Sequence, residues 1–345
     1  MLKSAEIPEE IIMERRTKAF RRNDELEKLL KEINSLMGEI EYKAVKDELN
    51  EYPIIFIVGA ARTGSTLCMQ WLAETGQIAY PTNLLSRFYE APVLGAKIQM
   101  LLTDEKYNFR NEILDFNSEI DFKSENGKTK GALSPNEFWY FWRRFLPFAE
   151  TDIRNDGELL NYTGKGKFKR ELLGLANIYK KPFALKGMIC NYNIKFLNKL
   201  FPKALFIYTK REISANILSL LEARIRQNGD KSIWYSFKIP EYSELIKIDN
   251  PEKQVAGQIY CINKAIQNAL KDVDESRKIT IQYEEFCEKP AYFYHAIIKK
   301  LQQQGYNLQD EYIGPEKFSV TRKDIDKKLL DYYDLFCNEY GKLFL

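Results

Sequence analysis

Histidine is almost absent from this chain of 345 residues, in which His295 stands alone. Cysteines are also few, and the five that occur lie far apart without a Cys-x-x-Cys pair. A zinc site built from histidine and cysteine is therefore close to excluded. The odd number of scattered thiols predicts reduced cysteines rather than a disulfide framework. A catalytic site that depends on histidine would have to use His295.

Long apolar runs and a dominant charge are missing as well. The longest apolar stretch, near residues 54–61, is far too short to span a bilayer, and residues 1–10 lack the apolar segment of a signal peptide. With 52 basic and 49 acidic residues, the net charge of +3 does not indicate a nucleic-acid or membrane coat. We therefore predict a soluble, cytoplasmic protein with no membrane span and no nucleic-acid partner, in which any anion is held locally.

The residues that are present predict an α/β fold. Hydrophobic residues make up 45% of the chain, enough for a large core. Residues 1–50 have apolar residues at the spacing of one helix face and are interpreted as an N-terminal helical arm. Residues 51–345 alternate apolar runs with helical patterns, which is typical of a three-layer sandwich around a central parallel sheet. The predicted strands are Ile54–Val58, Phe183–Leu185, Ala204–Tyr208 and Ile279–Tyr283.

Two segments between the strands have a different composition. Residues 84–174 are rich in aromatic side chains, and we interpret them as a helical insertion that covers the acceptor at the ligand end of the sheet. Residues 228–250 are interpreted as a second flap. Ligands of parallel sheets bind at the carboxyl ends of the strands. The residues expected at these ends are Arg62, Lys186, Arg211 and Tyr283.

A glycine loop follows the first predicted strand. Gly59 and Gly64 have the spacing G-x-x-x-x-G and precede a helical pattern, so the backbone N–H groups of the loop can surround a phosphate. A nucleotide triphosphatase needs lysine after the second glycine, where this chain has Ser65. The cation lies inside the loop instead, at Arg62, which favours a terminal phosphate held without a bound metal.

A second anion-binding pair follows the third predicted strand. Arg211 is expected at the strand end, and Ser219 lies two turns along the next helix. A guanidinium and a hydroxyl in these places can hold one phosphate from two directions. Alone the pair is a weak signal, because most arginines are simply solvated.

Three segments together resemble the sulfotransferase family. Residues 53–67 (PIIFIVGAARTGSTL) are similar to its 5′-phosphosulfate loop, and residues 201–208 with Arg211 and Ser219 look like its 3′-phosphate motif. Residues 281–286 resemble the strand end at which a tyrosine of the family contacts adenine. The resemblance implies the P-loop-like sulfotransferase fold, with 3′-phosphoadenosine 5′-phosphosulfate (PAPS) as donor, 3′-phosphoadenosine 5′-phosphate (PAP) as product and no metal.

The resemblance also implies a role for each matching residue. Lys186 matches a strand-end lysine that lies beside the transferred sulfonate, and with Arg62 it would neutralise charge during transfer. A late basic segment, residues 318–323, is similar to one that closes on the 3′-phosphate. The donor-binding residues implied are Arg62, Thr63, Gly64, Ser65 and Thr66 for the 5′-phosphosulfate, Arg211, Ser219, Arg322 and Lys323 for the 3′-phosphate, and Tyr283 for adenine.

Two positions depart from the family pattern. The proline usual before the loop cation is Ala61 here, and the histidine that many members place two residues after the lysine is Met188. We interpret His295 as a structural or surface residue. Other branches of the family use glutamate, and a partly buried carboxylate can act as a general base. The candidates are Glu90 and Glu137, both among aromatic residues.

The sequence thus predicts a sulfotransferase that moves the sulfonate of PAPS to a hydroxyl or amine of a small-molecule acceptor by in-line displacement. Each candidate glutamate also has a structural interpretation, Glu90 as a partner of Arg87 and Glu137 as a residue near a helix start. A P-loop kinase or triphosphatase, opposed by Ser65, and a catalytically inactive nucleotide-binding relative stay open as alternatives. The identity of the acceptor and the presence of a homo-oligomer also stay open.

Overall fold

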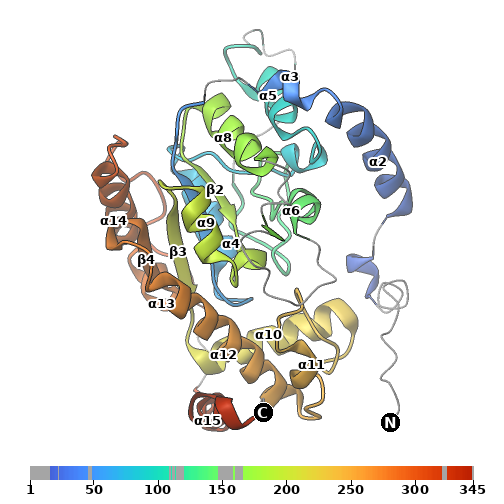
Figure 1. Ribbon diagram of the computed structural model, residues 1–345, viewed down its shortest axis with the longest axis vertical. Coiled ribbons are helices and arrows are strands. Elements are labelled where there is room, and N and C mark those ends of the chain that lie inside the picture. The colour runs from blue at the N-terminus through green and yellow to red at the C-terminus, as the bar shows by residue number, and fades with distance from the viewer. Residues whose placement is uncertain are drawn as a thin grey trace.

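A parallel sheet runs through the middle of the protein in the computed structural model (Figure 1). The strands occur in the order β2-β1-β3-β4, and each neighbouring pair is parallel. The four are β1 (Ile54–Val58), β2 (Phe183–Lys186), β3 (Leu205–Lys210) and β4 (Lys278–Gln282). All four predicted strands are thus confirmed, with small differences at their ends. The structure describes residues 16–21, 23–45, 49–108, 110, 113, 120–146, 158–159, 166–320 and 325–343, the side chains of 340–343 excepted.

Strand β1 shows why the sheet forms a middle layer. Its five residues are apolar and buried, and successive side chains of a strand point to opposite faces. Ile54 and Phe56 belong to the hydrophobic cluster on one face, whereas Ile55 and Ile57 belong to the cluster on the other. Such a strand is stable only where helices cover both faces of the sheet.

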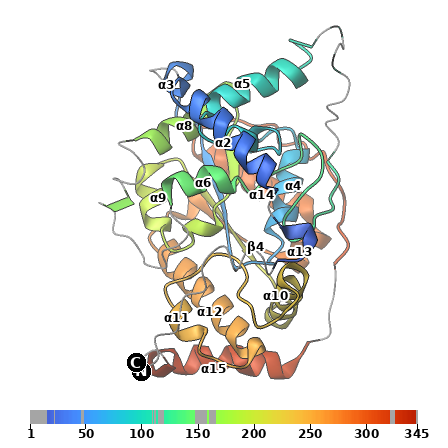
Figure 2. The ribbon, with the colours of Figure 1, turned by 90° about the vertical axis from the view of Figure 1, so that its right-hand side faces the viewer.

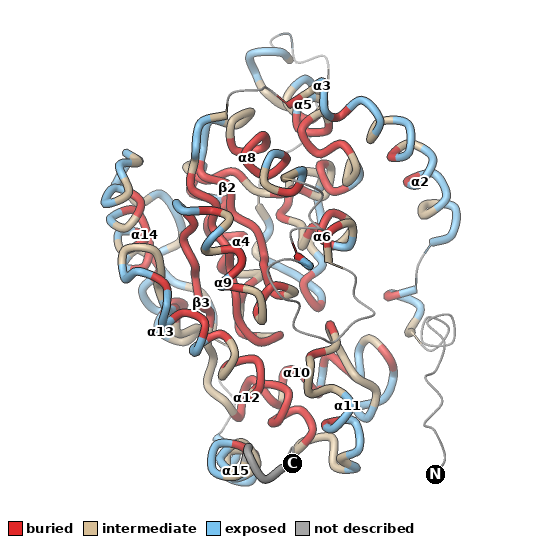
Figure 3. The backbone as a smooth tube through the Cα atoms, in the orientation of Figure 1, coloured by how far each residue is buried: buried red, intermediate tan, exposed pale blue. Residues whose placement is uncertain are grey.

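Helices cover both faces, which confirms the three-layer α/β sandwich (Figures 1 and 2). The smaller cluster is formed by α4 (Ser65–Glu74), α13 (Tyr283–Glu288) and α14 (Pro290–Gln303). The larger cluster includes residues of α8 (Lys167–Tyr179), α9 (Ile194–Leu200), α10 (Ile213–Asn228) and α12 (Pro251–Leu270). Figure 3 shows β2, β3 and the helix faces that meet the sheet as buried, whereas the edge strand β4 is only partly buried.

The other elements pack around these layers or connect them, and several add residues to the larger cluster. They are the 3₁₀-helices η1 (Lys18–Phe20), η2 (Leu85–Arg87), η3 (Met188–Cys190) and η4 (Glu275–Arg277) and the helices α2 (Asp24–Gly38), α3 (Glu41–Ala44), α5 (Pro92–Thr103), α6 (Trp139–Phe145), α11 (Tyr242–Leu245) and α15 (Lys327–Leu343). Within the part of the chain that the structure describes, no helix combines the length and the apolar character that crossing a bilayer requires.

The N-terminal arm lies against the predicted insertion. Asn34 of α2 donates to the carbonyl of Arg87 at 2.7 Å and accepts from the backbone of Glu90 at 2.9 Å. The Glu41 carboxylate of α3 accepts the backbone N–H groups of Val93 and Leu94, at the first turn of α5. These donors have no partner within the helix, so the arm caps α5. Figure 2 shows the arm crossing the front of the molecule, from α5 toward α10.

Candidate active site

A cavity of about 2010 Å³ lies at the carboxyl ends of the strands. The β1–α4 loop forms part of its lining, together with Lys186 at the end of β2, Arg211 after β3 and Tyr283 after β4. The other walls come from the N-terminal arm, from α10 and from the segments 83–87, 122–143, 235–238 and 315–319. The structure therefore brings the four residues expected at the strand ends into one cavity.

Buried hydrogen bonds hold the β1–α4 loop in shape. Asn191 accepts from the N–H of Gly59 at 3.2 Å and donates to its carbonyl at 2.8 Å. The Thr63 hydroxyl lies 2.8 Å from Thr209 Oγ1 of β3 and donates to the Ala60 carbonyl. The Thr63 side chain thus points into the protein rather than into the cavity. The loop reaches the start of α4 with its backbone already ordered.

Gly64 lies directly against Tyr283. Its φ of +86° is left-handed, and a Cβ at this position would lie 2.3 Å from Tyr283 Cδ2. Only glycine fits both the conformation and the space. The Arg211 guanidinium lies 4.8 Å from the centroid of the same ring, a cation–π distance. Burial raises the pKa of the Tyr283 hydroxyl to about 12, so the ring is neutral at physiological pH.

Arg62 reaches from the loop to α10. Its Nε lies 3.3 Å from the Ser219 hydroxyl, and its carbonyl accepts a hydrogen bond from Arg211 at 3.3 Å. Burial lowers the pKa of the Arg62 guanidinium, and the positive charges of Arg226 and Arg211 lower it further, while Tyr235 opposes them. Arginine stays charged under such shifts, so this arrangement gathers positive charge that an anion can neutralise.

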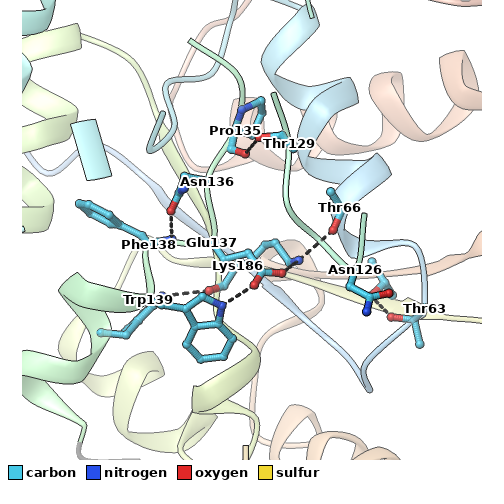
Figure 4. Close-up of polar contacts among 12 residues, drawn as sticks. Thr63, Thr66, Asn126, Thr129, Pro135, Asn136, Glu137, Phe138, Trp139 and Lys186 are labelled. Atoms are coloured by element: carbon cyan, nitrogen blue, oxygen red, sulfur yellow. Dashed lines mark hydrogen bonds and ion pairs between the residues drawn. The ribbon is translucent and has the colours of Figure 1, made fainter. Parts of the chain in front are cut away.

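Lys186 connects the loop to a carboxylate (Figure 4). Its Nζ donates to Thr66 Oγ1 at 2.9 Å and forms an ion pair with Glu137. The other carboxylate oxygen of Glu137 accepts from the indole of Trp139. Lys186 is only 7% exposed, and Trp142 donates to its carbonyl at 3.1 Å. A buried cation and a carboxylate with two partners therefore stand beside the glycine loop.

A tight turn at residues 125–128, inside the predicted insertion, positions Glu137. Asn126 and Gly127 have φ values of +49° and +90°, and two 2.9 Å backbone hydrogen bonds join Glu125 and Lys128. A Cβ at Gly127 would lie 2.4 Å from Glu137 Oε1, so the turn fits closely over the carboxylate. Asn-Gly is the dipeptide typical of such two-residue turns, and this signal was available in the sequence.

Tyr235, in the second predicted flap, is a residue that sequence reasoning did not identify. Its hydroxyl interacts with Arg62 and donates to the Asn126 carbonyl at 3.4 Å. Burial raises the pKa of this hydroxyl to about 12. No motif marks this tyrosine, because its position depends on how residues 230–240 fold back over α10.

Glu90 lies elsewhere. Its carboxylate forms a 2.8 Å ion pair with Arg144 Nε, and Arg144 also binds Glu171 at 2.7 Å. The partner is thus Arg144 instead of the expected Arg87. Glu90 is not among the residues that line the cavity, so the structure does not bring it to Lys186.

The other residues considered for the site lie either at the surface or in the cavity lining, apart from two outside the described residues. His295 lies in α14, half exposed, with its Nδ1 2.8 Å from Asp310 Oδ1, which confirms the surface position. Met188 lines the cavity near Lys186, where many family members have histidine. Gly64, Ser65, Thr66, Ser219 and Tyr283 line the cavity as well. Arg322 and Lys323 lie outside the described residues.

Comparison with known proteins gives one family. Residues 53–306 match the model of the "Sulfotransferase family". A solved sulfotransferase from Mycobacterium avium, STF9, is 17% identical, with a TM-score of 0.52 over 94% of this chain and 86% of that one. Sulfotransferase STF1 from Mycobacterium tuberculosis H37Rv is 14% identical, with a TM-score of 0.49 over 81% and 74%. Among curated protein sequences, no relative matches.

Proposed function

Because the chain belongs to the sulfotransferase family, we propose that it transfers a sulfonate group from PAPS to a hydroxyl or amine of a small-molecule acceptor. The observation that carries the proposal is the position of the Lys186 ammonium. It lies between Thr66 of the glycine loop and the Glu137 carboxylate. A cation for developing negative charge and a base for the acceptor proton therefore stand side by side.

The residues present fit this donor. PAPS supplies a sulfonate activated by its anhydride bond to a phosphate. The loop offers backbone N–H groups at the start of α4, where phosphates bind readily, and the hydroxyls of Ser65 and Thr66 line the same cavity. Arg211 and Ser219 are proposed to bind the 3′-phosphate, and Tyr283 the adenine. Arg62 and Lys186 supply the charge for the phosphosulfate.

In the proposed reaction, Glu137 takes the proton from the acceptor O–H or N–H. The acceptor atom forms a new bond to sulfur while the S–O bond to the phosphate breaks, and the electron pair of that bond stays on the phosphate of PAP. Lys186 and Arg62 neutralise the charge on the sulfonate and leaving oxygens. By analogy with phosphoryl transfer, such a reaction depends mostly on positioning and electrostatics.

We propose Glu137 as the base in preference to Glu90 on two grounds. The Glu137 carboxylate lines the cavity and contacts Lys186, whereas the Glu90 carboxylate is engaged by Arg144. The ion pair with Lys186 also holds the Glu137 carboxylate beside the glycine loop. When the donor's anionic groups draw Lys186 toward them, this pair opens and the carboxylate becomes available to the acceptor.

Glu137→Gln is the sharpest test, with Glu90→Gln as the parallel variant. Transfer from sulfur-labelled PAPS is measured with a panel of phenols, sugars and amines, and PAP binding by calorimetry. We expect Glu137→Gln to lower kcat by roughly 10²–10⁴-fold, the range of a lost general base, with PAP affinity within twofold of wild type. Glu90→Gln should keep its turnover.

Three results would count against the proposal in different ways. Full activity in Glu137→Gln, with loss in Glu90→Gln, would transfer the role of base to Glu90. Tight PAP binding by the wild type without transfer to any member of the panel would indicate an inactive nucleotide-binding relative. Magnesium-dependent hydrolysis of ATP without PAP binding would indicate a P-loop nucleotidase.

A further inference from the structure

The cavity holds far more positive charge than the donor needs. Its lining contains twelve lysines and arginines against three glutamates. The phosphate groups and the sulfonate of PAPS carry roughly four negative charges at neutral pH. Since the protein as a whole is nearly neutral, this excess is a local property of the cavity.

Part of the excess lies beyond the proposed donor site. Ser219, Glu222 and Arg226 line the cavity from one face of α10, at the three- and four-residue spacing of a helix. Arg226 follows Ser219 by seven residues, which places it two turns, roughly 10 Å, further along the helix axis. A group that binds Ser219 and Arg211 at the end of β3 therefore leaves Arg226 available to a different part of the ligand.

Two further basic residues lie near Arg226, and we call Arg16, Lys128 and Arg226 the basic cluster. Lys128 Nζ lies 4.8 Å from the centroid of the Phe20 ring. Burial lowers the pKa of Lys128 and the positive charge of Arg16 lowers it further, while the carboxylates of Glu137 and Glu125 oppose this shift. Among the described residues, no carboxylate lies within ion-pair distance of the Lys128 ammonium.

Contacts between distant segments hold the basic cluster together. Thr17 donates to the carbonyl of Gln227 through its N–H at 2.8 Å and to that of Arg226 through its hydroxyl at 2.7 Å. Asn126 donates to the Ala223 carbonyl at 3.4 Å and accepts from Arg226 Nε at 3.1 Å. These hydrogen bonds connect the arm, the Asn-Gly turn and the end of α10, the three segments that carry the positively charged residues of the basic cluster.

The acidic residue nearest to Arg226 on the helix offsets the charge of Arg226 only weakly. Glu222 lies 3.9 Å from Arg226, and both side chains are 48% exposed, so this ion pair is weak. Gathering like charges in a partly buried site is unfavourable unless a negative group joins them. The arrangement therefore points to an anionic ligand that is separate from the donor.

We infer that the acceptor is itself an anion, a hydroxyl or amine compound that carries a carboxylate, sulfate or phosphate group, and that the basic cluster binds this group. The inference rests on the proposed function, because it names the acceptor class for the same site. Phe20 and Tyr235 line the cavity beside the basic cluster and supply apolar contact for the body of the acceptor.

The test is a binding measurement on protein saturated with PAP, so that the donor site is filled. The probes are matched pairs: glucose 6-sulfate and glucose 6-phosphate against glucose, and 4-hydroxybenzoate against its amide. We expect at least one anionic probe to bind tenfold or more tightly than its neutral partner. The double variant Lys128→Gln/Arg226→Gln should lose this preference. Lys231→Gln, which removes an exposed lysine outside the cavity, should keep it.

PAP titration of the same variants separates this inference from the proposed function. We expect the double variant to bind PAP within twofold of wild type. A tenfold loss of PAP affinity would assign the basic cluster to the donor and overturn the inference. It would also be overturned if no anionic probe were preferred, or if the preference survived in the double variant. If wild type failed to bind PAP at all, the proposed function itself would fail.

Discussion

The two halves of the cavity are built differently. The half proposed for the donor consists of residues at the ends of the four strands, and the loop there is held by hydrogen bonds that involve Asn191 and Thr209. The half proposed for the acceptor is formed by segments that are far apart in the sequence, including the arm, the Asn-Gly turn and residues 235–238. One half takes its shape from the sheet, whereas the other takes it from contacts between irregular segments.

The stabilising contacts differ in the same way. Around the donor half, apolar side chains of β1 and β3 are fully buried between two helix layers. Around the acceptor half, buried polar groups join the segments, above all Arg144 between Glu90 and Glu171, and Glu41 at the start of α5. Such polar contacts depend strongly on geometry and protonation, so the acceptor half is expected to respond more to pH.

The largest expected effect concerns the rigid half. Gly64→Ala would place a methyl group 2.3 Å from Tyr283, so the ring or the loop must move. Because a displacement of about 1 Å at a binding site can weaken function about 100-fold, we expect a loss of that size in PAP affinity, measured by calorimetry. Gly76→Ala is the matched control, since Gly76 has a φ of +64° but no neighbour within 4 Å. It should lower stability only. Wild-type PAP affinity in Gly64→Ala would show that Tyr283 adapts.

A smaller effect is expected from Arg211→Ala. The loss of a charged hydrogen bond of about 1.5–3 kcal/mol predicts a tenfold or greater loss of PAP affinity. The KM for the acceptor should change little, since Arg211 belongs to the strand ends. Arg277→Ala is the control. Arg277 lies just before β4, at the end of the parallel sheet opposite to Arg211, and it does not line the cavity. Equal PAP affinity in both variants would remove Arg211 from the donor site.

The smallest expected effect concerns the pH response of the acceptor half. Burial raises the pKa of the Glu41 carboxyl to about 7, so the folded protein binds this proton more tightly than the unfolded chain does. The contribution of Glu41 to stability is therefore complete below about pH 4.5, falls as pH rises through about 7, and stays low above that. We expect a decrease of about 1–3 kcal/mol over this range in the free energy of unfolding.

Glu41→Gln should remove this part of the pH dependence, because glutamine does not titrate. Denaturant unfolding of both proteins at pH 5 and pH 8 measures the difference. Parallel pH profiles for wild type and variant would show that Glu41 titrates normally. PAP affinity of the folded variant should match wild type at both pH values, since Glu41 contacts α5 and does not line the cavity.

The sequence predicts the donor half well for a physical reason. A run such as Ile54–Val58 can be stable only inside a sheet, and Gly59 and Gly64 have few roles other than a tight loop after it. The carboxyl ends of parallel strands lie at the same edge of a sheet. The sequence alone therefore predicts that Lys186, Arg211 and Tyr283 lie at one site.

By itself, then, the sequence determined the sheet, the loop and the residues at the strand ends, because strand periodicity and glycine conformation are local properties. Only the tertiary structure shows that the two candidate glutamates have different partners. Both lie among aromatic residues in sequence, but Arg144 engages one and Lys186 the other. The basic cluster also exists only in the folded protein, because its members are separated by about a hundred residues in the sequence and no local pattern brings them together.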